Sequence, residues 1–152
     1  MNTEEKKIEK ICSFYVSDYH LEMIMIPYIN RKIEEKSNIE IISERKLKDT
    51  VKDVIKNINL TKQRKREMLN LSWNNSSTRK IKNQKSSKEQ VIFVVGSTSY
   101  IEKVNEEIEE KNNLSKTKII NCYNIEDIKQ NITEIATKHK KILNTKEEKE
   151  IA

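Results

Sequence analysis

Short apolar runs alternate with amphipathic segments along most of the chain. Four of the runs are rich in β-branched and aromatic residues, as strands buried on both faces are: residues 11–16, 39–42, 91–95 and 118–122. After each run, apolar residues recur at helical spacing. The pattern predicts two β-α-β-α halves and therefore an α/β fold, with a mainly parallel sheet of four to five strands and flanking helices.

In the first half, the ends of the predicted helices carry recognisable signals. Ser17 and Asp18 can cap the first helix, and Pro27 inside it is expected to kink it or mark a second start. A clean amphipathic helix is predicted from about residue 45 to 57. Thr61 can cap a short third helix. The alternation at 71–73 could then add an edge strand.

In the second half, Ser99 and Glu102 have the spacing of a capping box at the start of a helix. The outer face of this helix is strongly acidic. Asn124 is expected to cap the longest helix of the chain, because apolar residues keep helical period from Ile125 to Leu143, about five turns.

The charge of the chain is concentrated in one stretch. Residues 61–88 hold nine Lys or Arg and one acid, a net charge of +8, whereas the whole chain of 152 residues is +6. Residues 74–90 are mostly polar and predict a flexible basic loop. This loop would join a first half (1–73) to a second half (91–152), and the length favours one domain over residues 1–152.

Composition limits the compartment more than it limits the function. Hydrophobic residues make up 35% of the chain and charged residues 36%, and no apolar run approaches the length of a membrane span. The start of the chain lacks the apolar core of a signal peptide, so a cytoplasmic protein without a membrane partner is expected. The abundance of Lys, Asn and Ile is typical of AT-rich coding DNA. Cys12 and Cys122 lie far apart and are expected to be reduced and buried.

A candidate ligand site follows from the fold, because open α/β sheets bind ligands beyond the carboxyl ends of their strands. These ends converge only if the four strands share a sheet. The candidates at them are Ser17, Asp18, Glu44, Arg45, Gly96, Ser97, Thr98, Ser99, Tyr123 and Asn124. Asp18 and Glu44 could form a pair of carboxylates across a cleft, or act only as a helix cap and a strand-end charge.

Residues 96–99 have the strand, glycine and helix order of a phosphate site. They lack the further glycines of a dinucleotide fingerprint or a P-loop, and no Lys follows directly. A capped helix start without a ligand is therefore favoured, and no cofactor is predicted.

Catalytic and metal chemistry find little support in the sequence. Cys12, Cys122, His20 and His139 lack ligand spacing, so no metal site is predicted. No Ser or Cys elbow and no His with an orienting acid supports a triad, so no catalytic residue is proposed and the chain is not expected to be an enzyme. His139 is expected to be a partly buried residue of the last helix, and His20 an exposed one.

The basic stretch is a second candidate site, for nucleic acid. Cations there can contact phosphates, and one tryptophan offers a stacking surface. The candidates are Lys62, Arg64, Lys65, Arg66, Trp73, Arg79, Lys80, Lys82, Lys85 and Lys88. Two other interpretations stay open: a solvated surface loop, or a loop folded against the acidic helix at 102–110.

Two parts of the chain share a pattern with a known family. The first contains CSFY at 12–15, PYI at 27–29, IEE at 33–35 and IEII at 39–42, and the second is Cys122-Tyr123 ahead of the segment with His139. These parts resemble the MEDS sensory domains of DcmR-type regulators. That family has a RecA/KaiC-like α/β core without the nucleotide-hydrolysing loop, so the resemblance implies sensing or regulation.

The leading hypothesis is a non-catalytic, cytoplasmic sensory or regulatory protein that binds a partner protein or a small ligand. The alternative is a nucleic-acid-binding accessory protein that uses residues 61–88. A degenerate nucleotide-binding enzyme, with a nucleotide at 96–99, is the least favoured.

Overall fold

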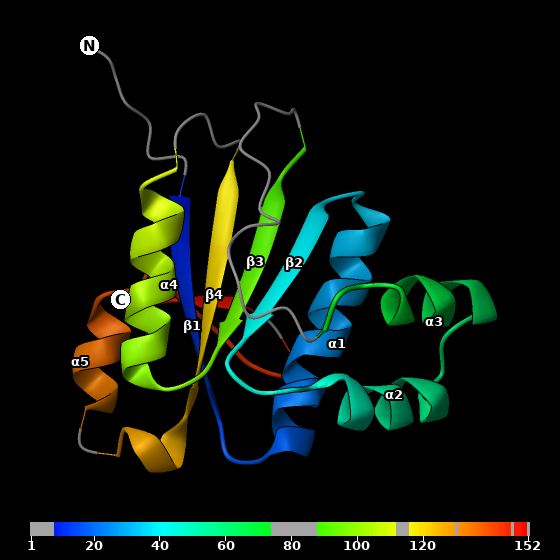
Figure 1. Ribbon diagram of the computed structural model, residues 1–152, viewed down its shortest axis with the longest axis horizontal. Helices are drawn as coiled ribbons and strands as arrows, with labels where there is room; N and C mark the ends of the chain where they lie inside the picture. The colour runs from blue at the N-terminus through cyan, green and yellow to red at the C-terminus, as the bar shows by residue number, and fades with distance from the viewer. Residues whose placement is uncertain (1–7, 74–87, 112–115, 130, 147, 152) are drawn as a thin grey trace.

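The computed structural model describes residues 8–73, 88–111, 116–129, 131–146 and 148–151, and shows one six-stranded sheet with helices on both faces (Figure 1). The strands are β1 (Ile8–Tyr15), β2 (Asn38–Ser43), β3 (Gln90–Val95), β4 (Thr117–Asn124), β5 (Lys141–Leu143) and β6 (Glu148–Glu150). Their order is β2-β3-β4-β1-β5-β6. All neighbouring pairs are parallel except β5 and β6, so the predicted α/β class with a mainly parallel sheet is confirmed.

The helices divide between the two faces of the sheet (Figure 1). They are α1 (Asp18–Glu34), α2 (Lys48–Asn57), α3 (Lys62–Leu69), α4 (Thr98–Glu109) and α5 (Ile132–Thr137), with a 3₁₀ turn at Ile125–Asp127. Helices α1, α2 and α3 pack on one side, named here the α1 face; α4 and α5 pack on the other, the α4 face. Strand β3 supplies Phe93 to the α1 face and Val94 to the α4 face, as alternation along a strand requires.

Two helix starts, those of α1 and α3, follow the signals in the sequence. The Ser17 hydroxyl accepts a hydrogen bond from the His20 N–H at 3.1 Å, and the Thr61 hydroxyl accepts one from the Arg64 N–H at 3.1 Å. Helix α1 continues through the exposed Pro27 as one helix, so the alternative of a second start is wrong.

Two of the predicted helix starts move by a few residues. Helix α2 begins at Lys48 and not near residue 45, because the Arg45 N–H donates to the Ser43 hydroxyl at 3.2 Å and holds a turn there. Ser97, and not Ser99, caps α4: its hydroxyl accepts from the Tyr100 N–H at 3.3 Å.

The predicted long C-terminal helix is wrong. Asn124 does act as a cap, but of the 3₁₀ turn, where its side chain accepts from the Glu126 N–H at 2.9 Å. After the short α5, the chain turns back as β5, which pairs Lys141 with Ile11 and Ile142 with Cys12 of β1. The isoleucines that suggested a helix also suit a strand, and pairing with the open edge of β1 decides the outcome.

The predicted edge strand at 71–73 is also absent. Trp73 is 1% exposed, lies in the core of the α1 face, and donates from its indole N–H to the Met68 carbonyl oxygen at 2.8 Å. The segment after α3 therefore closes the core and does not extend the sheet. The predicted loop at 74–90 lies mostly outside the described residues, and Gln90 already belongs to β3.

A chain of ion pairs crosses the sheet where the apolar core ends beneath the last turns of α1. Lys32 binds Glu89 at 2.8 Å, and Lys118 lies 3.8 Å from Glu89 and 3.6 Å from Glu148. Lys141 continues the chain, 3.3 Å from Glu148. These side chains are at most one quarter exposed, so the network joins α1, β3 and β4 to the terminal strands β5 and β6.

Candidate functional site

The strand ends predicted to converge do lie along one edge, because β1, β2, β3 and β4 are parallel members of one sheet. At this edge, however, the protein binds its own groups. The Glu44 carboxylate, just after β2, accepts a hydrogen bond from the Ser97 backbone N–H at 2.9 Å. An acid at the first N–H groups of α4 is where a phosphate would bind. The start of α4 is therefore already occupied by Glu44.

Gly96 makes this arrangement possible through close approach. A Cβ atom at this position would lie 2.6 Å from the Tyr100 ring and 2.9 Å from the Glu44 carboxylate oxygen. Both contacts are too short for a real side chain. Ser99 is exposed, and its hydroxyl lies 3.4 Å from that of Ser97.

Asp18 and Glu44 do not form a pair of carboxylates. Asp18 binds Arg45 at 2.6 Å, and Arg45 also donates to the Tyr15 hydroxyl at 3.3 Å. Burial raises the pKa of Tyr15 to about 12, so the phenol stays protonated. The two acids thus each hold a different partner, and the edge consists of a cap and an ion pair.

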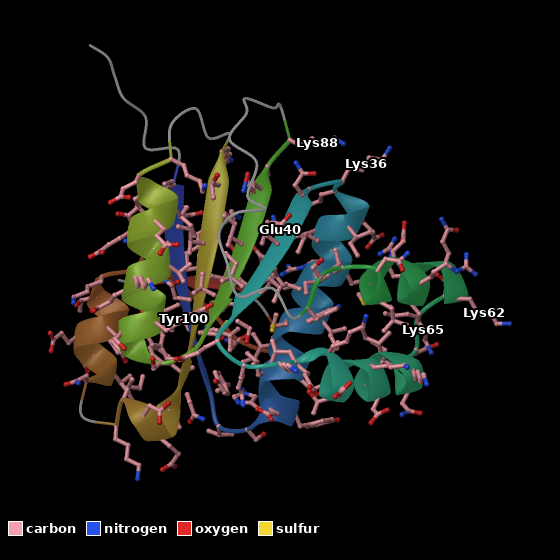
Figure 2. All side chains as sticks on the ribbon, viewed as in Figure 1. Lys36, Glu40, Lys62, Lys65, Lys88 and Tyr100 are labelled. Atoms are coloured by element: carbon pink, nitrogen blue, oxygen red, sulfur yellow. The ribbon has the colours of Figure 1, made fainter. Side chains whose placement is uncertain are left out.

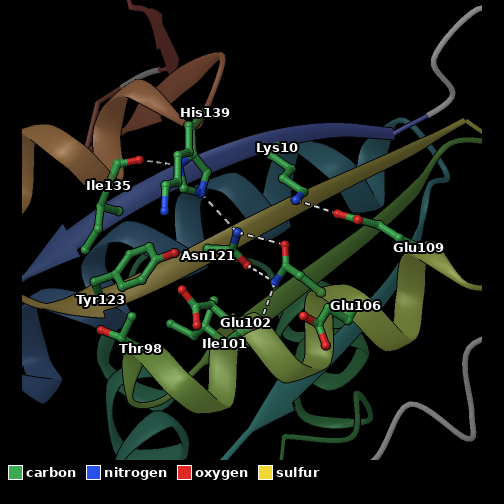
Figure 3. Close-up of a pocket in the computed structure, with 12 residues that line it drawn as sticks. Lys10, Thr98, Ile101, Glu102, Glu106, Glu109, Asn121, Tyr123, Ile135 and His139 are labelled. Carbon is green, nitrogen blue, oxygen red and sulfur yellow. Dashed lines mark hydrogen bonds and ion pairs between the residues drawn. The ribbon is translucent and has the colours of Figure 1, made fainter.

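Two of the predicted residues, Thr98 and Tyr123, contribute instead to a groove on the α4 face (Figure 3). The groove has a volume of about 370 Å³ and lies between α4, the strands β1 and β4, and the segment from α5 to His139. Tyr123 is 5% exposed and packs edge-to-face against the His139 ring, with centroids 6.0 Å apart. In Figure 3 the Tyr123 side chain lies along the groove beside Asn121.

The floor of the groove is a buried hydrogen-bond network of three side chains. Asn105 of α4 and Asn121 of β4 join their amides by two bonds, of 2.8 Å and 3.1 Å. The Asn121 amide nitrogen also lies 3.0 Å from His139 Nε2 (Figure 3). All three residues are at most 9% exposed. The network connects the middle of α4 to the middle of the sheet and to the residue after α5.

Backbone carbonyls at both ends fix the direction of every bond in this network. At one end Asn105 donates to the Ile101 carbonyl at 2.8 Å, and at the other His139 Nδ1 lies 2.8 Å from the Ile135 carbonyl. A carbonyl oxygen can only accept. His139 therefore carries its proton on Nδ1, and its Nε2 accepts from Asn121. Both ring nitrogens are thus engaged with the imidazole neutral.

The electrostatics around His139 favour that neutral form. Burial lowers the pKa of His139 from its ordinary 6.5, and the nearby positive charges of Lys10 and Lys138 lower it further, although the bond to the Ile135 carbonyl opposes them. A second proton would sit on Nε2, facing the amide N–H of Asn121. The network thus disfavours imidazolium by geometry as well as by charge.

The rim of the groove is charged, with acids in excess. Glu102, Glu106 and Glu109 come from successive turns of α4 and line one wall. Lys10 is paired with Glu109, and Lys138 stands exposed on the opposite side. Glu102 and Glu106 are exposed, and neither forms an ion pair with another residue in the described part of the chain.

The sequence did not identify Asn105 and Asn121 as site residues, although it contains a signal. Asn121 interrupts an otherwise apolar buried strand, and Asn105 lies four residues after Ile101 on the apolar stripe of α4. A polar residue at a core position needs a buried partner, and two such positions are candidates to bind each other.

The thiols and the other histidine do not form a reactive centre. Cys12 points into the core of the α4 face and Cys122 into that of the α1 face, so these free cysteines cannot bond to each other. Burial raises the pKa of Cys12 to about 11 and also raises that of Cys122. His20 accepts at Nδ1 from the Val16 N–H at 3.0 Å. Within the described ranges, no group of three acidic, Cys or His side chains is placed to hold a metal.

The basic stretch is only partly described, and several of its members have structural contacts. Arg64 donates to the Asn30 carbonyl at 3.1 Å, and Lys65 binds the Lys56 carbonyl at the end of α2 at 2.8 Å. Trp73, buried in the core, offers no surface for stacking, so its predicted role was wrong. Arg79, Lys80, Lys82 and Lys85 lie outside the described residues.

Two cations of α3, Lys62 and Arg66, are exposed, and their side chains form no hydrogen bond or ion pair within the described part of the chain. Figure 2 shows Lys62 extending away from the outer end of α3. Lys88, also exposed, lies just before β3.

Comparisons with family models, with curated proteins and with solved structures give no match for this chain. The resemblance to MEDS domains therefore stays a prediction. Of the helices that the structure describes, none combines the length and the apolar character needed to cross a membrane.

Proposed function

We propose that this chain is a non-catalytic, cytoplasmic sensory or regulatory α/β protein that binds a small ligand in the groove of the α4 face. The observation that carries the proposal is the groove of about 370 Å³ above the buried Asn105–Asn121–His139 network. This volume is at the lower end of the range for small-molecule sites, which commonly present a few oriented polar groups. Two reduced, buried cysteines suit a reducing compartment.

Binding is favoured over catalysis because the groups best suited to chemistry are already engaged. A general base needs a free nitrogen within reach of its substrate, and both nitrogens of His139 hold hydrogen bonds. A thiol nucleophile needs a lowered pKa and access to its substrate, whereas both cysteines are buried and have a raised pKa.

The same network supports a regulatory role. It joins α4 to β4 and to the turn that leads into β5, so a ligand bound above Asn121 contacts three elements at once. Any ligand that binds one arrangement of these elements more tightly shifts the population toward it. The sensed signal would then be a change in how α4 sits against the terminal segment.

Heteronuclear NMR of the labelled protein tests the proposal, because the side-chain amides of Asn105 and Asn121 give their own resonances. We expect at least one member of a mixed set of small amines, carboxylates, sugars and nucleosides to shift these signals. Peaks of the distant α3, such as that of Glu67, should stay in place and serve as the internal control.

If no compound of any charge moves the floor resonances, the proposed function is wrong. Turnover of a nucleotide or an ester by the purified protein, abolished by one substitution in the groove, would also overturn it, because the site would then be catalytic.

A second candidate function, nucleic-acid binding, is favoured by the exposed Lys62 and Arg66. It predicts affinity that falls steeply between about 50 and about 200 mM salt, since each phosphate contact releases counterions. Fluorescence anisotropy would compare the protein with Lys62→Gln/Arg66→Gln and with Lys80→Gln/Lys82→Gln/Lys85→Gln. Absence of binding at the lower salt concentration would exclude this function.

A further inference from the structure

The hydrogen-bond donors on the floor of the groove are all in use. The two N–H bonds of the Asn105 amide reach the Ile101 carbonyl and the Asn121 carbonyl oxygen. Those of Asn121 reach Asn105 Oδ1 and His139 Nε2. The single N–H of the neutral His139 reaches Ile135. The network therefore has no N–H left for a ligand.

Acceptor capacity, in contrast, remains. A carbonyl oxygen has two lone pairs, and the side-chain oxygens of Asn105 and Asn121 each accept one hydrogen bond within the network. The Tyr123 hydroxyl can also accept, and none of the described residues hydrogen-bonds to it. Above this floor stand the carboxylates of Glu102 and Glu106.

We propose that the groove selects a small organic cation, with a primary ammonium group bound between the Asn105–Asn121 floor, the Tyr123 hydroxyl and the carboxylates of Glu102 and Glu106. This inference rests on the proposed function, since it names the class of ligand for the same site. An ammonium group presents three donors and no acceptor, which matches a surface whose free groups accept. Hydrogen bonds between a charged donor and a carboxylate are about twice as strong as neutral ones.

An anionic ligand fits the groove poorly. It would meet the occupied donors of the network and the two carboxylates of the wall. Neither lysine of the groove is well placed to bind an anion. Lys10 is already bound to Glu109, and Lys138 stands at the exposed side of the rim. A bare metal ion fits no better, since no cluster of three suitable side chains occurs in the described part of the chain.

The test compares three probes of similar length on the full chain: putrescine, which is a diamine, succinate, which is a dicarboxylate, and butanediol, which is neutral. Binding is followed by the Asn105 and Asn121 side-chain resonances and by calorimetry. We expect putrescine to bind and to shift both amides, and the other two probes to leave them in place.

Matched variants separate a site from diffuse attraction. Glu102→Gln/Glu106→Gln keeps the shape of the wall and removes the charge of these two acids. It should weaken putrescine binding at least about tenfold, which is the effect of losing one charge-assisted hydrogen bond. Glu110→Gln changes an exposed acid at the end of the same helix, outside the groove, and should leave the affinity within about twofold.

The outcomes distinguish this inference from the proposed function. If succinate or butanediol binds at the floor and putrescine does not, the inference of a cationic ligand is wrong, while the proposed ligand site stands. Putrescine binding that Glu110→Gln weakens as much as the double variant would also overturn it, because the attraction would then be general. No shift with these probes or with the wider set would overturn both.

Discussion

The α1 face and the α4 face of the sheet are built on the same strands but bury different chemistry. On the α1 face, apolar and aromatic side chains such as Tyr28, Trp73 and Phe93 pack together, and a network of ion pairs lies at its end. On the α4 face, a smaller apolar cluster borders the amide and imidazole groups of Asn105, Asn121 and His139, beneath a groove.

Under the proposed function, this difference would separate stability from ligand binding in one small fold. Tight apolar packing contributes free energy of folding but offers no oriented polar group to a ligand. A buried polar network contributes less net free energy, yet it holds its groups in fixed directions. We therefore expect substitutions on the α1 face to act mainly on unfolding, and those on the α4 face to act on the groove as well.

The largest expected effect comes from the α1 face. Phe93→Ala removes a fully buried ring that packs edge-to-face on Tyr28, and should lower the free energy of unfolding by about 3–5 kcal/mol. Tyr19→Ala removes a ring of the same kind that is 65% exposed, and should change it by about 0.5 kcal/mol or less. Urea denaturation of both variants measures the contrast. Equal losses would mean that the core does not lie where it is described.

The polar network should be less costly to disturb but strongly coupled. Asn121→Leu leaves the amide of Asn105 and Nε2 of His139 without their partner, and should cost about 1–3 kcal/mol. Asn105→Leu/Asn121→Leu should lower the free energy of unfolding by less than the sum of the two single variants. Each single variant leaves the other asparagine without its partner, whereas the double variant removes both. Denaturant unfolding gives the double-mutant cycle.

For this cycle, Asn57→Leu is a control, since Asn57 is exposed and bonds only within α2. Strict additivity of the two network substitutions would contradict a shared network.

Gly96→Ala tests the carboxyl edge that lies between the two faces. The new Cβ would press on the Tyr100 ring at 2.6 Å and on the Glu44 carboxylate at 2.9 Å, so one of them must move, at a cost of about 1–3 kcal/mol. Tyr100→Ala should relieve part of this loss when it is combined with Gly96→Ala. Thermal unfolding of the three variants measures the effect, and a neutral Gly96→Ala would show that Glu44 does not hold the start of α4.

The smallest effect depends on pH and concerns His139 of the α4 face. The pKa of His139 is lowered in the folded protein, so below about pH 6.5 the unfolded chain binds a proton that the folded one does not. The stability contributed by neutral His139 is complete above that pH and is lost as pH falls toward the folded pKa, by at most about 1.4 kcal/mol per pH unit.

Denaturation of the protein and of His139→Gln at about pH 7.5 and about pH 5.5 measures this contribution. The positive Lys10 and Lys138 beside the imidazole should strengthen the dependence, whereas the acids of the groove wall, Glu102 and Glu106, should oppose it. The same slope in both proteins would contradict a neutral, network-bound His139.

The sequence was sufficient for the order of strands and helices along the chain up to β4, apart from the edge strand wrongly predicted at 71–73, because most local patterns there agree with the final contacts. Runs such as 91–95 are buried on both faces, and hydroxyls such as Thr61 cap the helices that follow. After Asn124 the local pattern is ambiguous, since isoleucine suits a helix and a strand alike. The pairing of 141–143 with β1 is a long-range choice that no window of sequence contains.

The site was harder to predict for a similar reason. Asp18 and Glu44 were recognisable as strand-end acids, but their partners Arg45 and Ser97 depend on which strands are neighbours. Asn105 and Asn121 are sixteen residues apart and meet only through the packing of α4 on β4. Trp73 misled because an aromatic residue among cations suggests stacking, whereas its burial was decided by the core beneath α1.

The two cysteines lie on opposite faces of the sheet, so each layer contains one thiol whose alkylation shows when that layer opens. Cys12 reports on the α4 face and Cys122 on the α1 face, although the two residues lie on adjacent strands. A buried thiol with a raised pKa reacts with an alkylating reagent only when its layer opens. The alkylation rates of Cys12 and Cys122 would therefore measure the opening of each layer separately. A ligand in the groove should lower the alkylation rate of Cys12 more than that of Cys122.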